Sequence, residues 1–231
     1  MADEHHHGHA WDQPEVFALN IMGYNTRFVG GPGKERADSL YSTLLIDGAY
    51  NIEESVRMPG KTVDFQKDGT SASAIIDGGE LYRNLGVTYA RRHVSLKFLP
   101  GNEAIIAVMD TVHSEGEHTY TWQLNIGDEE DADSIQVEIR NDAAPSHFVL
   151  HGNNSGKLLG WVLSPESVVF DESDDPLRVT TRGKSVRMTV LMYISDRDNI
   201  ELKSTGPEGS RRYHIGSGSV FIQEGRIHIH P

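Results

Sequence analysis

The sequence YTWQL at residues 120–124 alternates large apolar side chains with polar ones, and this pattern decides the fold class. Side chains along a β-strand point to opposite faces in turn, so the alternation predicts a strand with one buried face. No stretch of helical length shows a 3.6-residue apolar period. Further strands are predicted at residues 17–22, 44–46, 94–98, 104–110, 135–139 and 186–194. We therefore predict an all-β protein, a large antiparallel β-sandwich with little or no helix, in which residues 1–231 form a single domain.

Short turn sequences that contain glycine separate the predicted strands. Asp47-Gly48 and Asp77-Gly78 are typical of tight turns in which glycine adopts a positive φ. Because the predicted strands follow one another without helices, two antiparallel sheets are expected to face each other. Trp122 and Leu124 should then be partly or wholly buried between the sheets.

The overall composition limits the function. The chain has 231 residues and buries an adequate core without disulfides, and it has no cysteine for a Cys-ligated zinc or a thiol nucleophile. The net charge of −13 argues against unspecific binding to nucleic acid or anionic lipid. No apolar run approaches the ~20 residues that a membrane span needs. We therefore expect neither nucleic acid nor a membrane span among the interactions of this chain.

The chain begins with a histidine-rich segment, HHHGH at residues 5–9, and Asp12 follows three residues later. In an extended segment His7 and His9 lie on the same face, and a nearby carboxylate can complete a metal site or orient an imidazole. The alternative is the remnant of an expression tag or a frayed terminus. The residues that follow decide between these interpretations.

Residues 7–33, HGHAWDQPEVFALNIMGYNTRFVGGPG, resemble the opening of the C-terminal β domain in the heparinase II/III family of polysaccharide lyases. Three later segments are similar to further motifs of that family and occur in the same order. They are YSTLLIDG at residues 41–48, the block at residues 82–110 that contains Arg91-Arg92, and EHTYTWQL at residues 117–124. The resemblance covers roughly residues 5–200.

The resemblance implies an enzyme that cleaves uronic-acid-containing polysaccharide by β-elimination. Such a lyase removes the C5 proton of the uronic acid and expels the 4-linked sugar, which requires a base, an acid and a group that neutralises the carboxylate. In the family an N-terminal α/α toroid supplies most of these groups, and no such toroid is expected within residues 1–231. The β domain contributes the first histidine of His-x-His, which is His7 here. The resemblance also implies a periplasmic or secreted location, an acidic polysaccharide as substrate, and an α/α toroid domain or subunit as partner.

The second histidine of the family motif often binds a structural zinc, and this position is His9. The other family ligands are an Asp in a Val-Asp-x-Gly turn and the His that opens His-Asn-Thr-Val. This chain has Gly30 or Gly31 at the first of these positions and Tyr41 at the second. Because structural zinc needs a complete ligand set, only a degenerate zinc site is expected. Any bound ion should include His9, with Asp12 as a further ligand.

Three residues are candidates for binding substrate: Arg91, Arg92 and Trp122. Guanidinium groups bind carboxylates and sulfates in a bidentate manner, and the pair Arg211-Arg212 has the same capacity. Trp122 offers a flat ring for a pyranose face. The structural alternatives are an arginine that anchors a strand end and a tryptophan that packs on its neighbours in the sheet.

Two further observations leave the substrate and the remaining histidines open. At a net charge of −13, a highly sulfated chain is repelled unless a local basic cleft reverses the field, which favours a uronate-type or lightly sulfated substrate. His228 and His230 have metal-like spacing on a final strand but no visible third ligand. The isolated histidines, His93 and His118 among them, are expected at surfaces or in satisfied core positions.

Two classes of function remain. The first is the β domain of a polysaccharide lyase that contributes His7 to the cleft. The second is a non-catalytic carbohydrate-binding or structural β-sandwich. The ordered run of motifs favours the first class, whereas the missing toroid and the lost zinc ligands favour the second.

Overall fold

The computed structural model describes residues 17–30, 42–48, 60–127, 135–165, 168–171, 177–207, 210–223 and 225–231. Within these ranges the chain is all-β, as predicted. His7, His9 and Asp12 lie outside the described residues.

Long antiparallel strands and one short 3-10 helix make up the described chain. In chain order the elements are β1 (Ile21–Gly23), β2 (Thr26–Val29), β3 (Leu44–Ile46), β4 (Lys61–Asp68), β5 (Ser71–Asp77), η2 (Gly79–Leu85), β6 (Val87–Leu99), β7 (Glu103–Leu124), β8 (Gln136–Arg140), β9 (His147–His151), β10 (Lys157–Ser164), β11 (Leu177–Ser195), β12 (Lys203–Thr205), β13 (Arg212–Ile215), β14 (Gly218–Gln223) and β15 (Arg226–His230).

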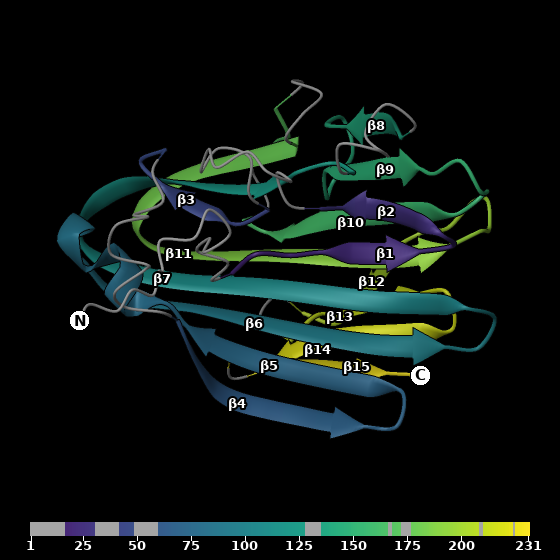
Figure 1. The fold of residues 1–231 in the computed structure, drawn as a ribbon, viewed down its shortest axis with the longest axis horizontal. Helices are drawn as coiled ribbons and strands as arrows, with labels where there is room; N and C mark the ends of the chain where they lie inside the picture. The colour runs from purple at the N-terminus through teal and green to yellow at the C-terminus, as the bar shows by residue number, and fades with distance from the viewer. Residues whose placement is uncertain are drawn as a thin grey trace, which may run out of the picture.

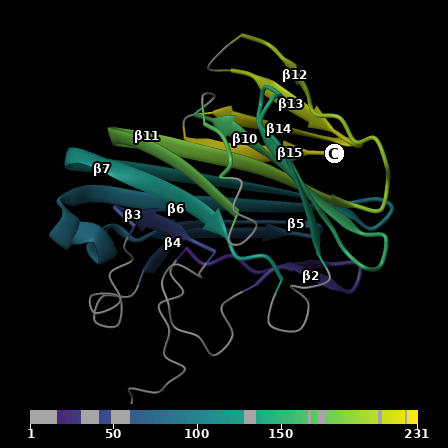
Figure 2. The same ribbon diagram turned by 90° about the horizontal axis from the view of Figure 1, so that it is seen from above.

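A nine-stranded sheet forms the centre of the molecule, with the strand order β4-β5-β6-β7-β11-β10-β9-β8 and with β3 paired to β7 (Figure 1). A four-stranded sheet, β12-β13-β14-β15, covers one face of it, and the two-stranded sheet β1-β2 lies on the other side (Figure 2). The central sheet is therefore sandwiched between two layers, which agrees with the predicted β-sandwich.

The central strand β7 is apolar on both faces because each face packs against a separate core. Ala104, Ile106 and Val108 belong to the core beneath β1–β3, and the alternate residues 105, 107 and 109 belong to the core beneath the C-terminal sheet. A strand that is buried on both faces is expected to be a continuous apolar run. Trp122 and Leu124 lie in the first core and are at most 1% exposed, as predicted.

The predicted strands at residues 104–110 and 120–124 are two halves of the single strand β7, which has 22 residues. On its partner β11, Gly183 pairs with His118 and Ser185 pairs with His113, so residues 114–117 of β7 bulge opposite Lys184. A bulge of this kind bends a strand and increases its twist. Both strands curve round at this point, at the left end of the molecule (Figure 1). We call this bend the corner.

The two predicted tight turns differ. Asp47 and Gly48 have φ values of 53° and 76°, so glycine adopts the predicted positive φ. Gly78 has a φ of −119°, which corrects the prediction for Asp77-Gly78. The chain continues there into η2, and the Gly79 N–H donates to Asp77 Oδ1 at 3.1 Å. The carboxylate thus starts a helical turn instead of closing a hairpin.

In the part of the chain that the structure describes, no helix has the length and apolar character needed to cross a membrane.

Candidate functional site

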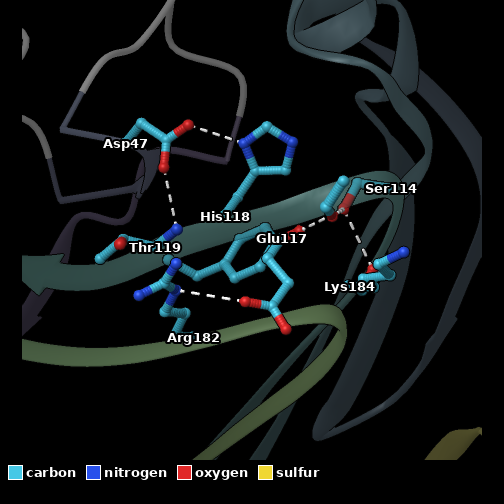
Figure 3. A network of polar contacts seen from close by, with 9 residues as sticks. Asp47, Ser114, Glu117, His118, Thr119, Arg182 and Lys184 are labelled. Atoms are coloured by element: carbon cyan, nitrogen blue, oxygen red, sulfur yellow. Dashed lines mark hydrogen bonds and ion pairs between the residues drawn. The ribbon is translucent and has the colours of Figure 1, made fainter.

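A histidine and an aspartate that are distant in sequence meet at the corner. Ile46 of β3 pairs with Tyr120 of β7, which places the turn after β3 beside His118. His118 Nδ1 lies 2.6 Å from Asp47 Oδ2, and the Thr119 N–H donates to Asp47 Oδ1 at 2.9 Å (Figure 3). Both oxygens of the carboxylate are thus engaged by consecutive residues of one strand.

These contacts favour the ionised form of Asp47 and set the hydrogen-bonding role of His118 Nδ1. The hydrogen bond from His118, followed by that from the Thr119 N–H, holds the pKa of Asp47 below its ordinary value. An ionised carboxylate can only accept, so Nδ1 of His118 carries the proton in this contact. Nε2 of the neutral ring is then an acceptor, and it points away from Asp47 in Figure 3. The arrangement is an imidazole oriented by a carboxylate, which suits proton transfer or anion binding.

Two further polar groups surround this pair. The Arg182 Nε lies 3.5 Å from Glu117 Oε2, and both side chains are exposed. Ser114 Oγ lies 2.7 Å from the carbonyl oxygen of Gly116 and 2.9 Å from the hydroxyl of buried Tyr120. These contacts satisfy polar groups of the bulge and hold the corner in one conformation.

Arg92, a predicted substrate-binding residue, lies in the interior. Its guanidinium is fully buried, with Nε 2.6 Å from Asp110 Oδ1. Nη1 donates to the carbonyl oxygen of Phe17, and the guanidinium lies 5.3 Å from the centroid of the Phe17 ring. Arg92 therefore anchors the first described segment to the central sheet. This placement corrects the expectation that it binds substrate, because no part of the side chain is accessible.

Trp122 is also enclosed, so the expectation that it stacks on a sugar is corrected in the same way. It is 1% exposed and pairs with Leu44 across β7 and β3. Its ring is packed in the core beneath β1–β3. The structural alternative for this residue, packing on its neighbours in the sheet, is the one that the fold supports.

Arg91 is the predicted substrate-binding residue that keeps an accessible surface. Its side chain is 40% exposed, and its Nε donates to Asp77 Oδ2 at 2.9 Å. It lines a groove of about 1010 Å³ between the central sheet and the C-terminal sheet. Arg91 and Arg92 are adjacent in an extended strand and point to opposite faces. The structure therefore does not bring Arg91, Arg92 and Trp122 together.

The pairing of Asp47 with His118 is not predicted from the sequence, where His118 stands alone and is expected at a surface or in the core. A signal was present, since Asp47 lies in the motif-like segment at residues 41–48 and His118 lies in the one at residues 117–124. The pairing of β3 with β7 brings the two segments together.

Solved structures of polysaccharide lyases share this arrangement of sheets. The heparan sulfate lyase HepC from Pedobacter heparinus matches 94% of this chain with a TM-score of 0.62 and 12% identity. The fold is that of a heparinase-like β domain. A structure of heparinase III matches 94% of this chain, with a TM-score of 0.59 and 13% identity. The heparinase III BT4657 gene product matches 84%, with a TM-score of 0.57 and 11% identity.

This chain corresponds to a fraction of the length of each of these proteins. It spans 36% of the HepC chain, 35% of the heparinase III chain and 30% of the BT4657 gene product. No protein family profile matches the sequence, and no curated protein matches it significantly.

Proposed function

We propose that this chain is the β domain of a polysaccharide lyase that cleaves uronic-acid-containing polysaccharide by β-elimination. The observation that carries the proposal is the corner, where Asp47 orients His118. The two residues come from two of the segments that resemble lyase motifs. The fold likeness to proteins described as heparan sulfate lyase and heparinase III gives this proposal its substrate class.

The proposed chemistry assigns a proton-transferring role to histidines of this domain. His7 is proposed to enter the cleft and to serve as acid or as partner of the uronate carboxylate. His118, with Nδ1 held by Asp47, presents Nε2 to accept a proton or to donate one to an anionic group. The positive charge of the exposed Arg182 stands close enough to Asp47 to lower the pKa of that carboxyl. An approaching uronate is favoured by the same charge.

The remaining catalytic groups are proposed to come from an α/α toroid, either as a domain of the same polypeptide or as a subunit. β-Elimination needs a base and a group that neutralises the carboxylate in addition to an acid. In the proposed division of labour, the heparinase-like domain supplies one wall of the cleft. The isolated domain is therefore expected to be a poor catalyst.

A zinc bound as in the family does not fit this chain at position 30. A Cβ atom on Gly30 would lie 2.1 Å from the carbonyl oxygen of Gly127, so this backbone has no room for a ligand side chain. We propose instead that any ion bound includes His9, with Asp12 as a further ligand. A mass-spectrometric metal assay on protein purified without a nickel column tests this. One zinc per chain that survives His9→Ala contradicts the proposal.

The lyase proposal is tested by the ultraviolet absorbance of the unsaturated uronate product. A panel of acidic polysaccharides is incubated with the domain alone and with a protein in which the domain is joined to an α/α toroid. We call this second protein the joined protein. We expect turnover from the joined protein on at least one uronate-containing polymer and little or none from the domain alone. Absence of product across the panel, with a folded joined protein, rejects the proposal.

A non-catalytic carbohydrate-binding β-sandwich is the second candidate. The observation that favours it is the position of Arg91, which lies in a groove between two sheets and not at the corner. A domain that binds acidic oligosaccharide while the joined protein yields no unsaturated product fits this second function.

A further inference from the structure

The groove between the central sheet and the C-terminal sheet has the dimensions of a ligand site. Its volume is about 1010 Å³, and ligand pockets commonly measure roughly 300–1,000 Å³. One wall comes from β5, β6, β7, β10 and β11, and the other comes from β13, β14 and the start of β15. The side chains that matter for the following argument are Tyr89, Arg91, Arg187, Arg211, Tyr213 and Arg226.

The charge of this groove is opposite to that of the whole chain. Four of the fourteen arginines line it, although the net charge of the protein is −13. Among the described residues that line it, none is Asp or Glu. Two carboxylates stand behind the lining: Asp77 pairs with Arg91 at 2.9 Å, and Asp64 lies 3.3 Å from Arg226. The three arginines Arg91, Arg187 and Arg226 outnumber these two carboxylates, which leaves a local excess of positive charge, and the concave walls concentrate it.

Arg187 contributes to that excess directly. It is exposed, lines the groove from β11, and forms no ion pair with another described residue. A guanidinium that is not committed to an internal carboxylate is available for a bidentate contact with a carboxylate or sulfate.

Arg91 is held in place beside an aromatic surface. Its guanidinium lies 5.0 Å from the centroid of the Tyr89 ring, and that ring lies 5.3 Å from the ring of His113. A side chain that is already fixed by Asp77 and Tyr89 loses less conformational entropy when a ligand binds. The groove thus combines preorganised cationic groups with flat rings, which suits a charged sugar chain better than a small inorganic ion.

The two walls are tied together at the floor of the groove. His93 of β6 is 6% exposed, and its Nδ1 accepts the N–H of Ile227 in β15 at 3.2 Å. Its Nε2 lies 3.2 Å from Ser95 Oγ. This contact connects the central sheet to the C-terminal sheet at a residue that lines the groove.

We propose that this groove is a second site, which binds an acidic oligosaccharide through its carboxylate or sulfate groups. The class of ligand rests on the proposed lyase function. The site is separate from the corner, because neither Asp47 nor His118 lines the groove. In this proposal the groove binds a segment of the polysaccharide away from the point of cleavage. Its basic surface attracts an acidic ligand although the protein as a whole is acidic.

Isothermal titration calorimetry on the full chain at low salt tests this proposal. The probes are a heparan sulfate hexasaccharide, neutral maltohexaose and inorganic sulfate. We expect one hexasaccharide per chain, no binding of maltohexaose, weaker binding of sulfate alone, and an affinity that falls as salt is added. Arg187→Gln should weaken hexasaccharide binding by roughly tenfold, because a charge-assisted contact is lost.

Arg212→Gln is the matched control. Arg212 follows Arg211 on β13 but lies over the ring of Phe221, at 5.1 Å from its centroid, and it does not line the groove. Hexasaccharide affinity should be unchanged in this variant. Equal weakening by Arg187→Gln and Arg212→Gln, absence of hexasaccharide binding, or equal binding of sulfate alone would each overturn the proposal.

One more variant separates this proposal from the lyase proposal. His118→Gln alters the corner and should leave hexasaccharide binding in the groove unchanged. A joined protein that binds through Arg187 but forms no unsaturated product rejects the lyase function alone. A joined protein that turns over substrate while the isolated domain fails to bind hexasaccharide rejects the groove alone.

Discussion

The two faces of β6 place neighbouring arginines in opposite environments. Arg92 points into the core beneath β1–β3 and pairs with Asp110, and neither side chain is more than 1% exposed. Arg91 points into the groove and pairs with Asp77, and its side chain remains 40% exposed. Both arginines pair with aspartates, and both lie against an aromatic ring.

The difference between these pairs is the access of water. In the interior, removal of either Arg92 or Asp110 is strongly destabilising, because it leaves the other charge buried without a partner. In the groove, water and ions screen the pair, so its contribution to stability is small and its N–H groups are available to a ligand. The buried pair of Arg92 and Asp110 therefore maintains the fold, whereas an exposed side chain such as Arg91 is available to bind a ligand.

Removal of each arginine in turn is the most direct test of this comparison. Arg92→Ala should lower the free energy of unfolding by about 3–5 kcal/mol, because Asp110 is left buried and unpaired. Arg91→Ala should cost less than about 1 kcal/mol. Urea denaturation followed by circular dichroism measures both. The double variant Arg92→Leu/Asp110→Leu should recover much of the loss, and equal losses for the two single variants would contradict the comparison.

Acidification should weaken the attachment of the C-terminal sheet. Burial, followed by the charges of Arg226 and His228, lowers the pKa of His93 to about 4, against 6.5 for the free side chain. Between these pKa values the unfolded chain binds more protons than the folded chain, so stability falls as the pH drops through this window.

The loss should approach about 3 kcal/mol below the folded pKa and vanish above the unfolded pKa. Thermal unfolding at a series of pH values measures it. In His93→Gln the part of the pH dependence that belongs to this residue should disappear. An unchanged pH profile in that variant would show that His93 is not the titrating group.

The largest effect on activity is expected at His7, the residue proposed to enter the cleft. In the active joined protein, His7→Ala should reduce turnover by ~100-fold or more, as loss of a general acid–base group does, while folding stays intact. The unsaturated-uronate absorbance measures turnover, and His6→Ala is the matched control from the same segment. Unchanged turnover in His7→Ala would mean that the role implied by the family resemblance is wrong at this residue.

Asp47→Asn should have a smaller effect than loss of His7, because it removes the orientation of a proton-transferring group and not the group itself. We expect kcat to fall by roughly tenfold with KM nearly unchanged and with little change in stability, since the Asp47 side chain is 48% exposed. Glu117→Gln, which changes an exposed carboxylate of the same corner, is the control. A change in KM alone would indicate a role in binding substrate.

Much of the fold is predictable from local sequence, and the exceptions have identifiable causes. The apolar run at residues 44–46 marks β3, and alternation locates the strands at 94–98 and 186–194 within β6 and β11. It does not reveal that one strand, β7, passes through residues 114–117, because a bulge interrupts the period without ending the strand. Similarly, Asp77-Gly78 has the composition of a tight turn, but the Asp77 carboxylate accepts the N–H of Gly79, the first residue of the 3-10 helix η2.

The sequence by itself determined the all-β class, the position of most strands and the resemblance to a lyase β domain, because these depend on periodicity and on motifs of a few adjacent residues. Only the tertiary structure decided that Asp47 meets His118 across 71 positions, that Arg92 is enclosed, and that Arg91 faces a groove. The physical reason is that alternation along a strand separates the two faces but carries no information about what covers each face. The long-range pairing of β3 with β7 and the docking of the C-terminal sheet supply that information.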